Sequence, residues 1–316
     1  MIEIKSIYIK DIQPGDKVSE PFLVTEKNLA FSQKGSPYLN LRLKDKTGEV
    51  EARIWDNAME WDRLFKRGDV IHVQGRAASF KNILQLSIFE VRKVDDVDLL
   101  DYFPAAKEDL DKMFGDLMVF VEQIRTPCLK ALLHAFFQDE TITTLFKKAP
   151  AAKSLHHAYI GGLLEHTLSI TRLLALMAKH YQGLNRDLLI TGGILHDIGK
   201  IHELSHQRVI DYTDHGRLVG HIVIGVEMLD AKIAHLKDFP AQLAMELRHL
   251  LLSHHGLLEY GSPKRPKTLE ALLVYYIDDL DAKVNAFKGF IDDSPDNGSD
   301  WTPFHRLFER FLYKGK

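Results

Sequence analysis

Two patterns of hydrophobic positions divide the chain. Up to about residue 95, hydrophobic and polar residues often alternate, which is typical of strands with one buried face. After Pro104, Leu, Ala and Ile recur at helical spacing. The pattern therefore predicts a multi-domain protein. We expect an all-β domain over residues 1–98, a helical linker or subdomain over 99–150 and an all-α domain over 151–316.

The N-terminal pattern predicts about five short strands. Alternating segments cover residues 38–43 and 49–55, and the turn between them ends at Gly48, as in a hairpin. One strand precedes this pair, and the segments 70–76 and 83–91 follow a short helical stretch over 57–65. Strands in this order, with one helix between the third and the fourth, predict an OB-fold barrel. Such barrels bind single-stranded nucleic acid, and small barrels also serve as assembly domains.

The remaining sequence predicts only helices. Thr126 precedes Pro127, and this pair is typical of a helix start, with threonine as the cap and proline in the first turn. Helices are expected at 110–124, 127–138, 157–181, 187–198, 217–235, 240–255, 267–288 and 303–313.

The composition is typical of a soluble protein with substantial cores, because 45% of the residues are hydrophobic and 27% are charged. The net charge of −3 gives no support to binding along duplex DNA, although a local groove can still be positive. No segment resembles a signal peptide or a membrane span, so we expect no membrane partner. Cys128 is the only cysteine, which excludes an internal disulfide. We expect a cytoplasmic protein.

Histidines are concentrated after residue 150, where 14 of the 16 lie. The segment from His196 to Lys200 reads His-Asp-Ile-Gly-Lys at the end of a predicted helix. An unpaired histidine or aspartate is costly to bury in an apolar helix, and imidazole with carboxylate suits Mn, Fe, Co, Zn or Mg ions. Each such residue alone is explained as a core or capping residue. The ordered set predicts a metal site: His166, His196, Asp197, His221, His254, His255 and Asp278.

This ordered set resembles the HD phosphohydrolase superfamily. The segment 158–168, together with the predicted barrel, resembles more narrowly the YhaM-type 3′→5′ exoribonucleases. The resemblance implies two divalent metal ions, with Mn²⁺ expected first and Co²⁺, Fe²⁺ or Zn²⁺ as alternatives. It also implies the following ligands: His166, His196, Asp197 and Asp278 for one ion, and Asp197 as a bridge to a second ion held by His221 and by His254 or His255.

Two further features of the sequence bear on the substrate and on the ligands. HD-GYP cyclic-dinucleotide phosphodiesterases carry a Gly-Tyr-Pro signature after the double histidine, whereas this chain reads Leu-Leu-Glu-Tyr-Gly-Ser-Pro over residues 257–263. This departure makes a cyclic dinucleotide a less favoured substrate. Asp281 follows Asp278 by about one helical turn, so we expect it to orient a ligand or a water.

Two metal ions about 3.5–4 Å apart can activate a water and stabilise a phosphoryl oxygen during in-line attack. Asp197 and Lys200 are therefore the candidate catalytic residues. Lys200 and Arg217 are candidate phosphate contacts, although a helix cap and a solvated surface position explain them equally well. His157 and His202 are weaker candidates for a place beside the ligands or the substrate.

On the predicted barrel, aromatic and basic residues are interleaved, as a single-strand groove requires. The candidate substrate contacts are Phe31, Tyr38, Arg53, Trp55 and Lys81, with Phe80 and Lys34 nearby in the sequence. For each ring taken alone, core packing is the simpler explanation.

We expect a metal-dependent exonuclease that acts on single-stranded nucleic acid. The RNA preference and the 3′→5′ polarity are implied by the resemblance alone. One alternative is a nucleotide or cyclic-dinucleotide phosphohydrolase with a regulatory barrel. Another is a non-catalytic nucleic-acid-binding adaptor, which the complete ligand set argues against. Homo-oligomerisation stays open.

Overall fold

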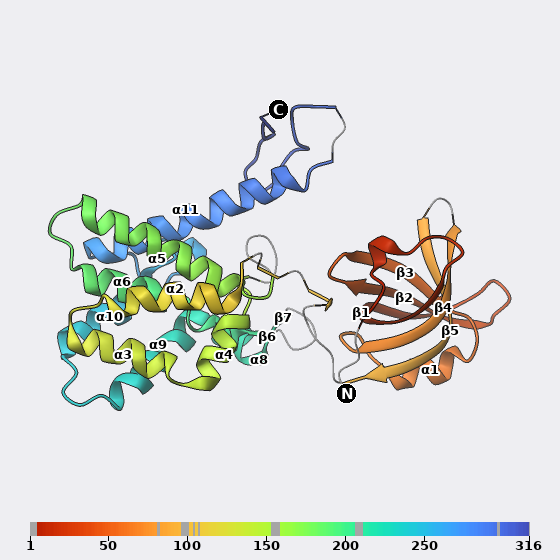
Figure 1. Ribbon diagram of the computed structural model, residues 1–316, viewed down its shortest axis with the longest axis horizontal. Coiled ribbons are helices and arrows are strands. Elements are labelled where there is room, and N and C mark those ends of the chain that lie inside the picture. Colours follow the sequence, from red (N-terminus) through yellow and green to blue (C-terminus); the bar gives the residue numbers. More distant parts are fainter. Residues whose placement is uncertain are drawn as a thin grey trace. The chain divides into compact units, whose positions relative to one another are not determined.

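The computed structural model describes residues 5–80, 83–95, 101–103, 105–106, 108–152, 159–205, 211–295 and 298–315. These residues form two compact units, one ending at Ala105 and the other beginning at Ala106. The first contains the strands of a barrel, and the second is mainly helical (Figure 1). Within the described ranges, no helix has the combination of length and hydrophobicity that crossing a membrane requires.

The first unit is a closed barrel with the strand order β1-β2-β3-β5-β4. Its neighbouring strands are antiparallel except β3 and β5, which are parallel. Helix α1 (Ala58–Leu64) lies between β3 and β4 in the chain, as predicted. The architecture confirms the expected OB-fold. The elements are η1 (Ile9–Asp11), β1 (Lys17–Phe31), β2 (Pro37–Asp45), β3 (Gly48–Ile54), β4 (Val70–Phe80) and β5 (Ile83–Val94).

The alternation in the sequence places one set of side chains inside the barrel. In β2, Leu39, Leu41 and Leu43 are buried, and the residues between them are more exposed. In β3, Ala52 and Ile54 are also buried in the same core. Because side chains of a strand point alternately to its two faces, the residues between these positions lie on the outer surface of the barrel. The candidate nucleic-acid contact Arg53 is among them, and Tyr38, next to Leu39 in β2, points to the same surface.

The second unit is built from helices around one core. Its helices are α2 (Leu110–Glu122), α3 (Pro127–Phe137), α4 (Glu140–Lys148), α5 (Gly162–His180), α6 (Arg186–Leu195), α7 (Lys200–Glu203), α8 (Asp214–Leu218), α9 (His221–Ala234), α10 (Ala241–Ser253) and α11 (Leu269–Asp292), with η3 (Leu258–Tyr260) after α10. Phe136 and Phe146 from the first three helices share this core with Leu163, Leu189 and Leu250 from the later ones. The predicted domain boundary at residue 150 stays a prediction.

Two secondary-structure predictions are wrong, helix α4 was not predicted, and one capping prediction is only partly right. Residues 303–313 form no helix but a turn with isolated bridges, in which apolar side chains pair across the turn, as Phe304 and Phe311 do. A short ladder of β6 (Leu204–Ser205) and β7 (Asp211–Tyr212) interrupts the helices. Thr126 is the N-cap residue of α3, but its hydroxyl donates to Asp187 and makes no capping bond.

Candidate metal centre

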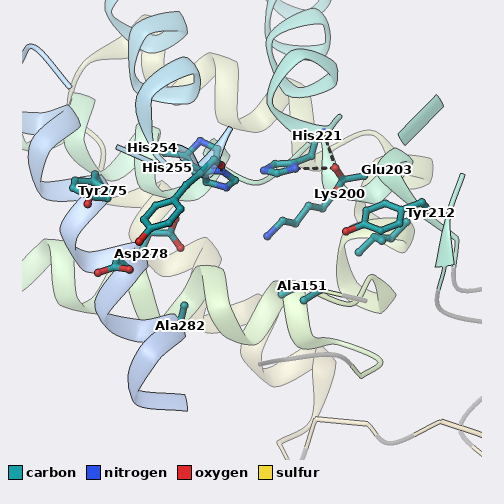
Figure 2. A pocket seen from close by; sticks show the side chains of 14 residues that line it. Ala151, Lys200, Glu203, Tyr212, His221, His254, His255, Tyr275, Asp278 and Ala282 are labelled. Carbon is teal, nitrogen blue, oxygen red and sulfur yellow. Dashed lines mark hydrogen bonds and ion pairs between the residues drawn. The ribbon is translucent and has the colours of Figure 1, made fainter. Parts of the chain in front are cut away.

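Five helices bring the candidate metal ligands together, and four of these ligands line one cavity. His166 lies in α5, and His196 and Asp197 directly follow α6. His221 is the first residue of α9, the double histidine follows α10, and Asp278 lies in α11. Figure 2 shows His221, His254, His255, Lys200 and Asp278 around this cavity. The structure therefore brings together all the residues that the sequence predicts as metal ligands.

All five histidines are held through Nδ1. In each case the partner is a backbone carbonyl or a carboxylate oxygen, which accepts the bond, so Nδ1 carries a proton and Nε2 is the ring atom left to face a metal ion. The Nδ1 atoms donate to Asp281 Oδ2 from His166 (2.9 Å), to Gly193 O from His196 (2.8 Å), to Glu203 Oε1 from His221 (2.9 Å), to Leu251 O from His254 (2.7 Å) and to Tyr260 O from His255 (2.9 Å).

Asp197 lies between two groups of these Nε2 atoms. Its Oδ1 is 3.4 Å from Nε2 of His221 and 3.4 Å from Nε2 of His254. Its Oδ2 is 3.4 Å from Nε2 of His196 and 3.7 Å from Nε2 of His166. Each oxygen of one carboxylate thus faces a different pair of histidines, which is the arrangement that a bridging ligand requires.

The donor atoms fit metal ions. Ligand atoms about 2.1 Å from one ion lie about 3.0–3.4 Å from one another, close to the separations around Asp197. Among the described residues, Asp197 Oδ1, His221 Nε2 and His254 Nε2 are buried without a hydrogen-bond partner. A buried polar atom without a partner costs about 1–3 kcal/mol. Two groups have ligand atoms that all lie within 4.8 Å of one another: His166, His196 and Asp197, and His221, His254 and His255.

The surroundings favour positive charge at the centre. Burial raises the pKa of Asp197, but the Lys200 ammonium and His196 outweigh this effect and hold it well below the usual range. Burial also opposes ionisation of Asp278, but the hydrogen bond with His166 prevails and its pKa is lowered. Burial lowers the pKa of His166, whereas hydrogen bonds to Asp278 and Asp281 raise it to about 9.

The cavity beside the ligands has a volume of 520 Å³, and Lys200 lines it. The Lys200 ammonium is 2.6 Å from Asp197 Oδ2, so it reaches the ligand cluster as the sequence predicts. Arg217 is exposed in α8, pairs with Asp211 and is not among the residues that line this cavity. His202 is exposed on α7, and His157 lies outside the described residues.

The sequence analysis missed Glu203, which contacts the ligand cluster. Its Oε1 accepts both the backbone N–H and the Nδ1–H of His221, each at 2.9 Å. Asp281, by contrast, lies where the sequence predicts, with its Oδ2 on Nδ1 of His166. A signal for Glu203 was present: it is a carboxylate between Ile201 and Leu204, two apolar residues that are buried here.

The barrel carries an exposed aromatic surface. Tyr38 and Trp55 stack with their ring centroids 4.6 Å apart, and the Arg53 guanidinium lies within 6 Å of both rings. Trp55, Phe31 and Phe80 are 46%, 66% and 56% exposed, so core packing does not explain these three rings. Phe89, which the sequence analysis missed, is 62% exposed on β5. Lys81 lies outside the described residues.

Comparisons with known families agree with both halves of the chain. Residues 163–283 match the HD domain, and residues 23–94 match an OB-fold nucleic acid binding domain. Fold and site together define an HD-domain enzyme, of the metal-dependent phosphohydrolase class, with an OB-fold domain.

Individual relatives narrow this class. The chain is 32% identical over 284 residues to the 3′-5′ exoribonuclease YhaM of Bacillus subtilis, and the aligned region covers 89% of either chain. It is 34% identical over 274 residues to the protein of the same name from a Geobacillus species, covering 86% of this chain and 84% of that one. The chain belongs to the YhaM family. Among solved structures, the second OB-fold domain of replication protein A from Methanococcus maripaludis is similar over 28% of this chain and 94% of its own, with 20% identity and a TM-score of 0.24.

Proposed function

We propose that this protein is a metal-dependent 3′→5′ exonuclease that hydrolyses phosphodiester bonds in single-stranded nucleic acid, with RNA as its preferred substrate. One observation carries the hydrolytic part of the proposal. Asp197 lies between two groups of histidine Nε2 atoms, and His221, His254 and Asp278 beside it line a 520 Å³ cavity. The polarity and the RNA preference are supported by the names of the relatives.

The donor set supports two divalent ions, with Mn²⁺ preferred and Co²⁺, Fe²⁺ or Zn²⁺ as alternatives. Asp197 would be the shared ligand, and Asp278 would complete the group of His166 and His196. His221, His254 and His255 would hold the second ion, since the Nδ1 of each is anchored to an oxygen. When bound, such a pair of ions supplies an activated water and stabilises charge on a phosphoryl oxygen during in-line displacement.

The remaining roles are assigned to basic and aromatic side chains. Lys200 would meet the scissile phosphate, because its ammonium lies at the cavity wall beside Asp197. Arg217 would bind only a phosphate outside the cavity. On the barrel, bases would stack on the rings of Tyr38, Trp55 and Phe31, while Arg53 and Lys81 would pair with phosphates.

The test offers full-length protein with Mn²⁺ four substrates side by side: 5′-labelled single-stranded RNA, single-stranded DNA, a cyclic dinucleotide and a nucleoside triphosphate. We expect the labelled RNA to shorten progressively from its 3′ end with release of mononucleotides. The variant Asp197→Ala should show no hydrolysis while its circular dichroism stays helical. Asp116→Ala is the matched control, because that carboxylate pairs with Arg172 on the surface.

Two results would contradict the proposal. Turnover by Asp197→Ala close to that of the control would show that the cluster is not the catalytic centre. Hydrolysis of the cyclic dinucleotide or the triphosphate, with intact RNA, would replace the nuclease by a small-nucleotide phosphohydrolase.

A further inference from the structure

The five histidines are anchored in two different ways. Three of them donate to backbone carbonyl groups, which no side-chain substitution can remove. The other two donate to carboxylates, His166 to Asp281 and His221 to Glu203. One carboxylate-anchored histidine occurs in each of the two ligand groups. Each group therefore has one ligand whose orientation depends on a replaceable side chain.

Glu203 is itself held firmly. Its backbone carbonyl accepts the N–H of Thr213 at 2.9 Å. Gly216 packs so closely against it that a Cβ at position 216 would lie 2.2 Å from the Glu203 carbonyl oxygen. The residue is 8% exposed. A carboxylate on so fixed a backbone can define the position of the group that it binds.

His221 depends on this carboxylate for more than its ring orientation. It is the first residue of α9, and the N-cap residue, Gly220, has no side chain with which to bind the first N–H groups of the helix. Glu203 Oε1 accepts the His221 N–H in place of such a cap. One oxygen thus fixes both the start of α9 and the tautomer of its first side chain.

We propose that Glu203 is a positioning residue that keeps His221 in place for the second ion, so that loss of its carboxylate weakens that ion and leaves the first one bound. The inference rests on the two-ion centre of the proposed function. Removing a hydrogen-bond partner of a histidine ligand typically lowers metal affinity about 10- to 100-fold. Asp281 plays the same part for His166, so the two carboxylates act on different ions.

The experiment counts ions and does not depend on activity. Full-length wild type, Glu203→Gln and Asp281→Asn are loaded with Mn²⁺ and dialysed against graded chelator. Manganese per chain is measured by mass spectrometry, and the spin coupling of paired ions by electron paramagnetic resonance. Glu227→Gln is the control, because this exposed carboxylate lies on the same helix as His221.

We expect Glu203→Gln to release one ion at a chelator concentration about 10- to 100-fold lower than wild type. The ion that stays should show no spin coupling. Adding His254→Ala to Glu203→Gln should change nothing further, whereas adding His196→Ala should remove the remaining ion. In Asp281→Asn, adding His196→Ala should change nothing further, whereas adding His254→Ala should remove the remaining ion.

Retention of both ions by folded Glu203→Gln at the wild-type chelator concentration would overturn the proposal and leave Glu203 as a helix cap. Release of both ions together by Glu203→Gln would also overturn the proposal. If Glu203→Gln does not fold, Glu203→Asp, which keeps the charge but shortens the reach, should give the same selective loss. Wild type that holds two ions but degrades no nucleic acid would refute the proposed function alone. Wild type that saturates with one ion would refute the present inference and leave the Asp197→Ala test standing.

Discussion

Replacing Gly199 with alanine should displace the start of α9 from the HD motif. The backbone of Gly199 has φ −64° and ψ −17°, which alanine adopts without strain, so the only difficulty is space. A Cβ at this position would lie 2.1 Å from the carbonyl oxygen of His221 and 2.6 Å from the backbone nitrogen of Gly225. Both contacts are backbone atoms of α9, and neither can rotate away.

The size of the effect follows from these distances. Real Cβ contacts are essentially never shorter than 3.0 Å, so α9 and the motif must separate by about 1 Å. Overpacking of this kind costs about 1–3 kcal/mol of stability. Because His221 is the residue that moves, its Nε2 should leave its place 3.4 Å from Asp197 Oδ1. A displacement of 1 Å at a reacting centre costs about 100-fold in rate.

The assay compares Gly199→Ala with Gly192→Ala. In the control, the new methyl group would lie 2.7 Å from Leu250 Cδ1, the end of a side chain that can change its conformation. Urea denaturation gives the loss of stability, and kcat/KM on a short oligonucleotide gives the loss of activity. We expect about 100-fold lower kcat/KM for Gly199→Ala than for Gly192→Ala. Equal activities of the two variants would refute the reasoning from backbone contact.

Three further predictions concern other parts of the chain. Trp55→Ala should weaken binding of single-stranded RNA by about 1–3 kcal/mol in a binding titration and leave hydrolysis of a small chromogenic phosphodiester unchanged; an equal loss on both substrates would contradict a stacking role. Asp187 accepts hydrogen bonds from the N–H groups of Arg125 and Thr126, which outweigh burial and lower its pKa. The ionised form of Asp187 therefore stabilises the fold at pH values above the ordinary pKa of an aspartate. Asp187→Asn should lower the free energy of unfolding by about 1.5–3 kcal/mol at pH 7, measured by urea denaturation. The difference from wild type should vanish as the pH falls below about 4. Gly115→Ala in α2 should raise stability by about 0.5–1 kcal/mol, since a Cβ there has no atom within 4 Å, and an unchanged denaturation midpoint would contradict this.

The barrel was predictable because its information is local. In β2, the buried leucines alternate with polar residues, and the hairpin turn before Gly48 has the expected sequence. The candidate metal ligands could be picked out for a different reason, since His166 and Asp278, for example, follow largely apolar segments of their helices. A buried polar side chain needs a polar partner. In this cluster the predicted ligands are partners of one another.

What the sequence did not predict depends on contacts between distant segments. The apolar residues of 303–313 have helical spacing, but they pair across a turn instead, as Phe304 and Phe311 do. Thr126 has the position of a helix cap, yet its hydroxyl is directed to Asp187, 61 residues away in the chain. Glu203 gained its role only because α9 begins beside it. The pattern of hydrophobic and polar residues in a short segment of the sequence cannot show partners that lie far away in the chain.

The HD motif illustrates how local sequence and tertiary contact combine. His196 bends back onto the Gly193 carbonyl, which directs its Nε2 toward the centre. Asp197 has one oxygen near each group of histidines, and Ile198 is fully buried in the helical core. Gly199 has no side chain, so the backbone of α9 can lie where a Cβ would otherwise be. The Lys200 ammonium forms an ion pair with Asp197. Each position of the motif therefore has its own physical requirement, and the glycine is what lets a ligand from a separate helix reach the aspartate.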